Sequence, residues 1–577
     1  MYNVQENVRI VVSLLKEYNV RHVVLNPGGT NIPVVQAIQD DPFFQCYSIV
    51  DERSAMYFAI GLHLQTGEVI ATSCTSAQAT RNYIPGLTEA FYKHTPIVAI
   101  TTSKLERYSY QQYMQAPIQT SLPVDSVKRS FDLPPVTDEN TRAQCCKLAK
   151  EAIIEVTHRN PGPVQINIRI NDSLNCQFEN IQLPTIRKVT RYMAWDTWDD
   201  LNLQNKKILI IVGEHRPFSE KQKVSIDNFM EFHDCVAYTN HISNYHGKYS
   251  INANLLVSCG GLKQDGMTPD ILITIGGQTG DYSIYGAING NISDFEHWRV
   301  SEDGILIDTY CHLTKIFECP FDYFFNRISK REKSPHSYYK IWKNLEGKLN
   351  RNVDIPLSNL YVAQQLSSKI PDNSIMNFAI LNSFRSWCYF YLRSSIRCFA
   401  NVAAYGIDGC TSMLIGESVN SDSLCFLVTG DLAFFYDMNA LGIRHIKNNV
   451  RILLINNNEG VEFSYMTKDW IYKHDIHPYT SAKGHFGTAK GWAEDCGFKY
   501  ICAVNKEEFN SKADEFVSYC DKPIIYEIFT RLDEEVNAWE SLIKSNALYN
   551  KSEKLKAVVH KILGDDCTKI IKKILKK

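Results

Sequence analysis

Short apolar runs that alternate with helical patterns constrain the fold of this chain more than any other feature of the sequence. In the first block, apolar runs at 21–25, 69–72 and 97–101 alternate with helical patterns such as residues 53–65. The segment "NPGPVQINIRIND" then turns through Pro and Gly into another strand. Alternation of this kind predicts βαβ units that build a parallel sheet.

The same alternation returns twice further along the chain. A second block starts at "KKILIIVGEHRP" and includes "PDILITIGGQTGDYS", and a third block has apolar runs at 423–428, 450–455 and 523–529. A chain of 577 residues is too long for one hydrophobic core. We therefore expect an α/β protein with three doubly wound parallel-sheet domains. We place these domains at 1–185, 200–345 and 356–540, with a polar linker before residue 200.

Two glycine clusters lie in the second block, in "VGEH" and "IGGQTG". Neither matches the phosphate-binding spacings GxGxxG or GxxxxGK[ST]. We interpret both clusters as tight turns from a strand into a helix.

Composition excludes several classes of protein. The chain has 61 Lys and Arg against 63 Asp and Glu, so its net charge of -2 offers no general attraction for nucleic acid or an anionic membrane. The 17 cysteines include no CxxC pair, and the first residues have a helical pattern rather than that of a signal peptide. No apolar run reaches the roughly 18–20 residues of a membrane span. We expect a cytoplasmic protein with free thiols and no nucleic-acid partner.

The segment 546–577 has a pattern of its own. Apolar residues recur at helical spacing among nine lysines from Lys551 to Lys577, with a break at Gly564. This pattern predicts a Lys-rich amphipathic helical tail. We favour a tail docked on its own protein or on another subunit, and a contact with a partner protein or a membrane surface is the alternative.

Polar residues follow two neighbouring apolar runs of the third block. Asp431 comes after "CFLVTG", and three asparagines that end in Asn458 come after "VRILLI", with one helix expected between them at 436–449. Ligands bind beyond the carboxyl ends of parallel strands, so Asp431 and Asn458 should face one crevice. A carboxylate, an amide and a carbonyl at the Gly460 turn are oxygen ligands suited to Mg²⁺. Asx capping of the turns is the alternative that these residue types alone favour.

The fuller pattern "GDL…YDMNAL…NNN" resembles the diphosphate-anchoring motif of thiamine diphosphate enzymes. It is similar in particular to the menaquinone-pathway carboligase 2-succinyl-5-enolpyruvyl-6-hydroxy-3-cyclohexene-1-carboxylate synthase. The resemblance covers residues 5–540, is weakest in the middle block, and implies a pyrimidine-binding, a central and a diphosphate-binding domain. It implies that Asp431, Asn458 and the Gly460 carbonyl hold Mg²⁺. It also implies a homodimer or homotetramer in which each thiamine diphosphate lies between two subunits.

Glu52, in "VDERSAMYFAIGL", falls on the glutamate that in this family hydrogen-bonds the pyrimidine ring of the cofactor and so activates it. Taken alone, a glutamate there is more simply a favourable charge at a helix N-terminus. Because the third block also carries the metal-binding motif of this family, we favour the catalytic role of Glu52 over that alternative.

Four further segments, "PGGTNIP", "CTSAQATRNYIPG", "YMQAPIQ" and "GIDG", are similar to family segments in order and spacing. By this resemblance, Gln115 reaches the reacting substrate and Ile407 braces the bent cofactor. An ordinary core isoleucine is the alternative for Ile407. The remaining cofactor-binding residues that the resemblance implies are Pro27, Gly28, Thr75, Asn82, Gly406, Asp408, Gly430, Leu432 and Phe463.

The chain departs from the family's pattern where substrates bind. Gly29 and Thr30 stand where the family has the Ser-Arg pair of its isochorismate-binding loop, and Gly-Thr cannot replace a bidentate carboxylate clamp. The two donor-binding arginines of the family fall on Val402 and near Trp387, and Arg385 is a candidate substitute two positions away.

Two more residues belong to the candidate substrate site. Ser383 keeps the serine that precedes the second donor arginine, and Glu462 replaces an apolar residue ahead of Phe463. Glu462 is either a solvated turn residue or a partly desolvated carboxylate that transfers protons or binds hydroxyl groups.

We therefore expect a thiamine diphosphate- and Mg²⁺-dependent carboligase. It would decarboxylate a small 2-oxo acid, pyruvate or 2-oxoglutarate, and transfer the acyl carbanion to an electrophilic acceptor other than isochorismate. Pyruvate is the first donor to test because it needs no clamp for a distal carboxylate. The alternatives are a simple 2-oxo acid decarboxylase and a non-catalytic cofactor-binding subunit.

Overall fold

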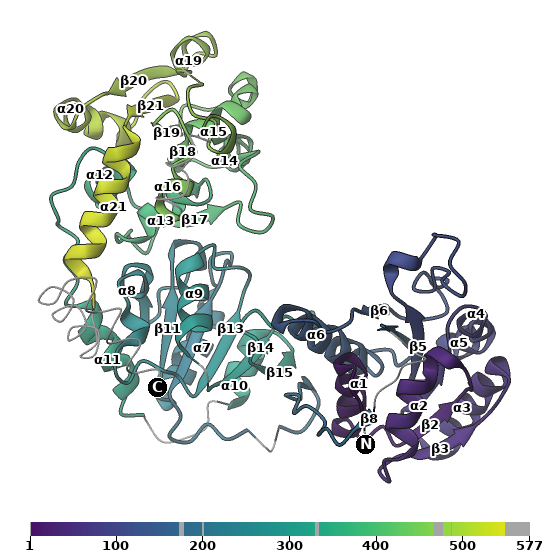
Figure 1. Ribbon diagram of the computed structural model, residues 1–577. Helices are drawn as coiled ribbons and strands as arrows, with labels where there is room; N and C mark the ends of the chain where they lie inside the picture. The colour runs from purple at the N-terminus through teal and green to yellow at the C-terminus, as the bar shows by residue number, and fades with distance from the viewer. Residues whose placement is uncertain are drawn as a thin grey trace, which may run out of the picture. The chain divides into compact units, whose positions relative to one another are not determined.

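The computed structural model describes residues 2–171, 178–198, 201–292, 294–328, 334–466, 477–485 and 487–548 (Figure 1). The chain forms two compact units. The first unit comprises residues 1–191 with 306–308 and 313–316, and the second comprises the rest of the chain. No helix among the described residues is both long enough and apolar enough to cross a membrane.

The first unit is built on a six-stranded sheet, as far as its described residues show, in the order β3-β2-β4-β5-β7-β6. Every neighbouring pair in this sheet is parallel. Its strands are β2 (His22–Leu25), β3 (Gln45–Ser48), β4 (Ile70–Cys74), β5 (Ile97–Lys104), β6 (Ser130–Leu133) and β7 (Val164–Ile170). Its helices are α1 (Glu6–Glu17), η1 (Gly29–Asn31), α2 (Ile32–Gln39), α3 (Glu52–Thr66), α4 (Gln78–Asn82), α5 (Ile84–Tyr92), η2 (Glu106–Tyr108) and α6 (Glu139–Glu155).

Among the described residues, two further sheets lie mainly in the second unit, and the first of them has the order β12-β11-β10-β13-β14-β15-β9. Residues 190–191 of β9 and 313–316 of β15 are counted with the first unit. The pairs from β12 to β14 are parallel. The strands are β9 (Thr190–Met193), β10 (Ile208–Val212), β11 (Cys235–Thr239), β12 (Ser250–Asn252), β13 (Ile271–Ile275), β14 (Glu296–Val300) and β15 (Leu313–Glu318). The helices of this region are α7 (Glu220–Phe232), η3 (His241–Ser243), α8 (Asn254–Ser258), η4 (Gly261–Lys263), α9 (Tyr282–Asn291), α10 (Phe321–Ile328) and α11 (Ser337–Glu346).

The other sheet of the second unit has the order β17-β16-β18-β19-β21-β20, with all neighbouring pairs parallel. Its strands are β16 (Ile375–Phe378), β17 (Arg397–Ala400), β18 (Cys425–Gly430), β19 (Val450–Asn456), β20 (Lys499–Ala503) and β21 (Ile524–Phe529). The helices are α12 (Asn359–Leu366), α13 (Asn382–Cys388), α14 (Cys410–Ser418), α15 (Asp431–Tyr436), η5 (Met438–Gly442), α16 (Glu462–Met466), α18 (His477–Thr480), α19 (Lys490–Asp495), α20 (Lys506–Val517) and α21 (Leu532–Asn546).

Both faces of each sheet are buried. In β10, Ile208 and Ile210 belong to one apolar cluster, whereas Leu209 and Ile211 belong to another. The other two sheets divide their strand residues between two clusters in the same way. Because successive side chains of a strand point to opposite faces, helices must cover both sides of each sheet. The predicted doubly wound parallel α/β fold is confirmed.

The strands of the three sheets lie within 22–170, 190–318 and 375–529. The domain boundaries at 1–185, 200–345 and 356–540 remain predictions, and most of the Lys-rich tail, from residue 549 onward, lies outside the described residues.

Two local predictions were wrong. The expected linker before residue 200 contains β9 and β8 (Phe178–Glu179), and β8 pairs antiparallel with β1 (Tyr2–Asn3). Isolated apolar side chains explain why this polar stretch is ordered, because Val189, between Lys188 and Thr190, and Tyr192, next to Arg191, are buried. In place of the single helix expected at 436–449, α15 begins at Asp431 and ends before Asp437, and the short 3-10 helix η5 follows at Met438–Gly442. The Asp437 carboxylate between them accepts hydrogen bonds from Ser412 N and Oγ at 2.7 and 2.8 Å.

The two glycine clusters of the central sheet pack against each other. A Cβ on Gly213 would lie 1.8 Å from Gly277 O, so only glycine allows the two backbones to approach. Gly277 N donates to Glu214 O at 2.9 Å, and Glu214 N donates to Gln278 O at 2.9 Å. These two clusters form tight turns at the carboxyl ends of β10 and β13, as the sequence predicted.

A short segment after β11 ties the two sheets of the second unit together. The Asn244 side chain donates to Cys398 O at 2.7 Å and accepts from Cys398 N at 2.9 Å, in the edge strand β17. His241 Nε2 donates to Trp387 O at 2.9 Å. Both contacts use buried polar groups, so they fix β17 and α13 relative to the central sheet.

Candidate active site

Asp431 lies at the carboxyl end of β18 and is the first residue of α15. The residue is 2% exposed, and its carboxylate is held by backbone donors: Leu432 N donates to Oδ1 and Asn458 N donates to Oδ2, both at 2.7 Å. His485 Nε2 lies 3.1 Å from the same Oδ2. Burial raises the pKa of Asp431, and the hydrogen bonds from His485 and from the backbone oppose that rise. The carboxylate thereby fixes the turn after β19 against the start of α15.

The three asparagines at the end of β19 and directly after it have different contacts. Asn456 donates to Glu527 Oε1 at 2.7 Å, and Asn457 Oδ1 accepts from Glu459 N at 3.2 Å. Asn458 has a φ of 63°, a left-handed conformation that Asn tolerates better than most residues. The first two asparagines therefore shape the turn, and Asn458 is the one whose backbone contacts Asp431.

These groups fit a magnesium ion by their chemistry. The carboxylate of Asp431, the side-chain amide of Asn458 and the carbonyl of Gly460 are hard oxygen donors supplied by two adjacent turns of the chain. Gly460 N donates to Ser481 O at 2.6 Å, which anchors the end of the second turn. No cluster of three or more His, Cys, Asp or Glu side chains that could hold a metal occurs in the part of the chain that the structure describes. A metal at Asp431 would therefore need the amide and carbonyl oxygens.

Glu52 is the first residue of α3, in the first unit. Asp51 caps this helix by accepting from Arg53 N at 3.0 Å, whereas the Glu52 carboxylate has no hydrogen bond or ion pair with any other described residue. Burial raises the pKa of Tyr83, and the charge of Glu52 adds to that rise. An unpaired carboxylate at a helix start fits the predicted bond to a cofactor ring.

The loop after β2 folds tightly against the loop after β4. Gly28 has a φ of 153°, and a Cβ there would lie 2.2 Å from Thr75 Cβ, so glycine is required. Thr30 is buried, with its hydroxyl 2.7 Å from Thr75 Oγ1 and 3.0 Å from Thr102 Oγ1. A Cβ on Gly29 would meet no atom within 4 Å. The Cα of Gly29 thus faces open space, whereas the Thr30 hydroxyl lies within hydrogen-bonding distance of Thr75 and Thr102 in the same unit.

Several predicted site residues lie on the surface of their own unit. Ile407 is 37% exposed between Gly406 and Gly409, so the alternative of an ordinary core isoleucine is wrong. Gln115 is exposed and has a φ of 57°. Other residues in this exposed group are Pro27, Asn82, Asp408 and Phe463, and Leu432 is half-buried beside Gly460.

Arg385 and Glu462, two of the residues that depart from the family's pattern, bind each other. Arg385 Nη1 and Nη2 donate to Glu462 Oε1 and Oε2 at 2.8 and 2.5 Å. The guanidinium also lies 5.1 Å from the ring centre of Tyr465. Arg385 is therefore not a free substitute for a missing substrate-binding arginine.

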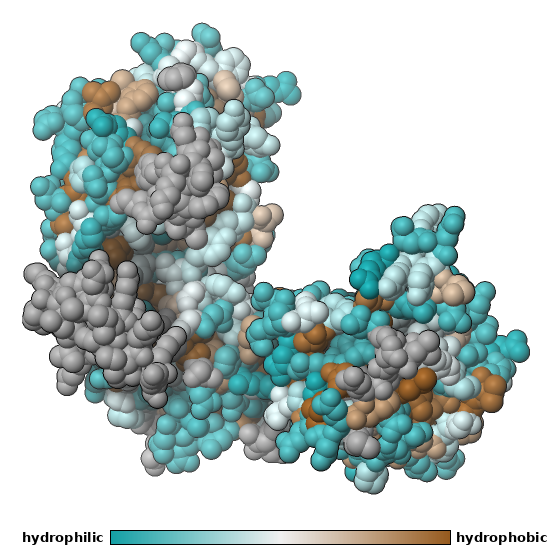
Figure 2. Space-filling model, in the orientation of Figure 1, coloured by the Kyte–Doolittle hydropathy of each residue, from teal (hydrophilic) through white to brown (hydrophobic). Residues whose placement is uncertain are grey.

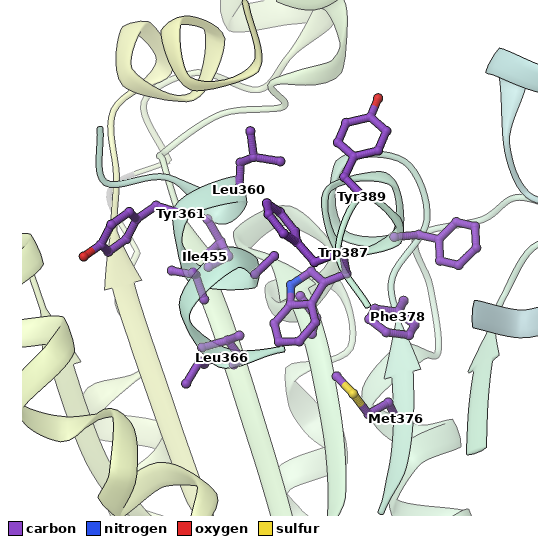
Figure 3. Packing of buried hydrophobic residues seen from close by; sticks show 14 of the residues in the cluster. Leu360, Tyr361, Leu366, Met376, Phe378, Trp387, Tyr389 and Ile455 are labelled. Atoms are coloured by element: carbon purple, nitrogen blue, oxygen red, sulfur yellow. The ribbon is translucent and has the colours of Figure 1, made fainter. Parts of the chain in front are cut away.

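The other donor-site positions are part of the core. Trp387 is fully buried and packs with Phe378 and Leu366 in the cluster drawn in Figure 3, whereas Arg385 contacts Glu462 outside that cluster. Residues two apart on a helix point in nearly opposite directions, which explains this division. Val402 is fully buried against Gly280, in the loop after β13. Ser383 is 6% exposed at the start of α13.

Three polar residues near Asp431 were not predicted from the sequence: His485, which is half-buried, and the buried Glu527 and Glu535. His485 contacts Asp431 itself, and Glu527 accepts four hydrogen bonds, one of them from Asn456. Glu535 accepts from Asn359 N and Thr530 Oγ1 at 2.9 and 2.8 Å, and burial raises its pKa to about 7. The glycines beside His485 were the one local signal, since Glu527 lies in an apolar run and Glu535 in an acidic first turn of a helix.

Comparisons with known proteins define the class first. The family model described as "Thiamine pyrophosphate enzyme, N-terminal TPP binding domain" matches residues 6–122, a range that contains Glu52. Together with the three parallel α/β sheets, this match makes the chain a thiamine diphosphate enzyme.

Relatives along the whole chain narrow this class. A 2-succinyl-5-enolpyruvyl-6-hydroxy-3-cyclohexene-1-carboxylate synthase of Phocaeicola vulgatus is 32% identical over 567 residues, which cover 96% of this chain and 100% of that protein. Proteins of the same name from Bacteroides thetaiotaomicron and Bacteroides fragilis are each 31% identical and cover 93% of this chain and 98% of their own length. The chain belongs to the 2-succinyl-5-enolpyruvyl-6-hydroxy-3-cyclohexene-1-carboxylate synthase family.

Proposed function

We propose that this chain is a thiamine diphosphate- and Mg²⁺-dependent carboligase that decarboxylates a small 2-oxo acid with a single carboxylate, with pyruvate as the first choice. It transfers the acyl carbanion to a polar carbonyl compound other than isochorismate. The cofactor supplies, when bound, the carbanion chemistry that no side chain offers. Asp431, Asn458 and the Gly460 carbonyl hold Mg²⁺ at the diphosphate, and Glu52 holds the pyrimidine ring.

The observation that carries the proposal is that Gly29 and Thr30 offer no positively charged group to an acceptor. Gly29 has no side chain, and the Thr30 hydroxyl is engaged by Thr75 and Thr102, so neither residue offers a charge to a carboxylated acceptor. A protein usually recognises a carboxylate with an arginine that donates two hydrogen bonds to it, or with another positively charged hydrogen-bond donor. The cofactor-binding residues are kept while this clamp is absent, which supports a changed acceptor.

We further propose a homodimer or homotetramer with the site shared between subunits. In α3, Ala55, Met56, Ala59 and Ile60 are buried in the first unit, while Tyr57, Phe58 and Leu64 are 47%, 41% and 69% exposed. Figure 2 shows hydrophobic residues on the surface of the first unit. A helix that is apolar on both faces is normally covered on both. This supports burial of α3 against a second subunit.

The test measures carbon dioxide release from pyruvate by the purified chain, with and without thiamine diphosphate and Mg²⁺. We expect release that depends on both, and a loss of about 100-fold or more in Glu52→Gln because a positioned proton-transfer group contributes that much. Glu139→Gln is the matched control, since Glu139 also follows an aspartate cap, Asp138, as the first residue of a helix. Release that persists in Glu52→Gln would refute the proposed role.

Product analysis separates the alternatives. Carbon dioxide and free aldehyde without a ligated product would make the chain a simple 2-oxo acid decarboxylase. The identity of 32% with the Phocaeicola vulgatus protein favours, as a second candidate, the reaction that this relative's name describes. Turnover of isochorismate with 2-oxoglutarate, at a rate above that with pyruvate, would establish that candidate instead.

A further inference from the structure

The Arg385–Glu462 pair lies at the edge of the sheet that carries the proposed metal site. Arg385 is in α13, which follows β16, and Glu462 begins α16, which follows β19. Strand β18 lies between β16 and β19, is parallel to both, and ends at Gly430, directly before Asp431. The pair therefore spans the carboxyl end of the strand that presents Asp431, where ligands of open parallel sheets bind.

The two side chains neutralise each other in a sheltered position. The side chains of Arg385 and Glu462 are 18% and 12% exposed. Burial opposes the charge of Arg385, but the hydrogen bonds to Glu462 more than offset it and raise the pKa of the guanidinium. A bidentate pair of this kind uses both carboxylate oxygens and both terminal nitrogens of the fork. The guanidinium edge formed by Nη1 and Nη2 is therefore already occupied by Glu462.

We infer that the Arg385–Glu462 pair determines which donor acids this enzyme accepts, by keeping the guanidinium bound to Glu462 and presenting a neutral wall to the donor. This inference rests on the proposed function and extends it to the donor. A 2-oxo acid with a second carboxylate would meet an arginine that is already paired and a glutamate of its own charge. The second carboxylate of such an acid would lose its water without gaining a counter-charge, and specificity against these acids comes from this penalty as much as from contacts with the preferred donor. Pyruvate carries no second carboxylate and avoids the conflict.

The test replaces Glu462 so that Arg385 keeps its charge but loses its anionic partner. In Glu462→Gln holoenzyme, we expect the ratio of kcat/KM for 2-oxoglutarate to that for pyruvate to rise about 10-fold or more over the unchanged chain. The double variant Arg385→Gln/Glu462→Gln should lose this gain, and Glu462→Asp should keep the original preference. An unchanged ratio in Glu462→Gln would overturn the inference and leave the pair as a structural link between α13 and α16.

A matched control addresses general effects of breaking an ion pair. Arg299 donates to Asp303 Oδ1 and Oδ2 at 2.5 and 2.9 Å, in the central sheet region. Asp303→Asn should leave the donor ratio unchanged. A ratio that rises in Asp303→Asn as well would contradict a specific role for Glu462.

A binding measurement separates this inference from the proposed function. Glutarate has two carboxylates and no keto group, so it reports on the anion site without turnover. By calorimetry, we expect glutarate to bind Glu462→Gln at least 10-fold more tightly than the unchanged chain or the double variant. If no 2-oxo acid is turned over but this pattern appears, the proposed function fails and the role of the pair stands. Equal glutarate binding by all three proteins would overturn the role of the pair.

Discussion

Ala77 and Leu381 combine a positive φ with a ψ near -120°, a backbone conformation that favours glycine. Ala77, between β4 and α4, has φ 69° and ψ -118°, and Leu381, between β16 and α13, has φ 61° and ψ -123°. Both lie where a strand passes into a helix that carries predicted site residues. Such a conformation costs about 1–3 kcal/mol for a residue with a Cβ and persists only when its surroundings enforce it. At Ala77 the enforcing contact is its N–H, which donates to the buried Gln119 at 2.9 Å.

Ala77→Gly should stabilise the chain. Glycine relieves the strained backbone at the expense of a more flexible unfolded chain, and we expect a net gain of about 1 kcal/mol, seen as a higher melting temperature. Leu381→Gly is the contrasting variant. Leu381 packs against the core cluster of α12 and α13, so its removal should lower the melting temperature despite the same relief. A lower melting temperature in Ala77→Gly would contradict the strain argument.

At the scale of elements, η3 links the two sheets of the second unit through a buried histidine. His241 donates its Nε2 proton to Trp387 O, and burial, opposed by this hydrogen bond, lowers the pKa of His241 to about 4. An unfolded histidine titrates near 6.5. Between these two values the unfolded chain binds a proton that the folded chain excludes. The folded state must therefore lose stability as the pH falls from about 6.5 to about 4.

His241→Gln should flatten this dependence. We expect the free energy of unfolding of the unchanged chain to fall by about 2 kcal/mol more between pH 7 and pH 5 than that of the variant. The measurement is denaturant unfolding at both pH values. Burial also lowers the pKa of His246, which remains in both proteins and leaves a residual slope. Equal pH dependence in the two proteins would show that His241 is not buried as a neutral group.

The elements themselves were largely predictable, because parallel strands buried on both faces appear in the sequence as continuous apolar runs. The runs at 21–25, 450–455 and 523–529 match β2, β19 and β21 within two residues. The contacts at the site were less predictable. Arg385 and Glu462 are 77 residues apart, and His485 and Asp431 are 54 apart. Each residue alone resembles an ordinary surface charge, and only the fold brings the partners together.

At the scale of the whole molecule, the two carboxylates of the proposed site belong to different units, Glu52 to the first and Asp431 to the second. The proposed oligomer takes these two residues from different chains. A symmetric assembly repeats such a shared site at every equivalent interface. In this proposed assembly, each chain contributes Glu52 from its first unit to one site and Asp431 from its second unit to another site.

Co-expression of Glu52→Gln and Asp431→Asn chains tests this arrangement. Either variant alone should be inactive. In a random mixture, a shared site receives an intact Glu52 half the time and an intact Asp431 half the time, so about a quarter of the activity should return. If both residues acted within one chain, every site would lack one of them and the mixture would stay inactive.

The contact between Asn244 and Cys398 has a further consequence for how the protein behaves in solution. Strand β17 is an outer strand of its sheet, and the free N–H and C=O groups of such strands can recruit strands of other molecules into aggregates. The Asn244 amide pairs with both backbone groups of Cys398, as a neighbouring strand would. One side chain thus protects this edge from intermolecular β-sheet growth, and a chain without Asn244 would gain a site for self-association during expression.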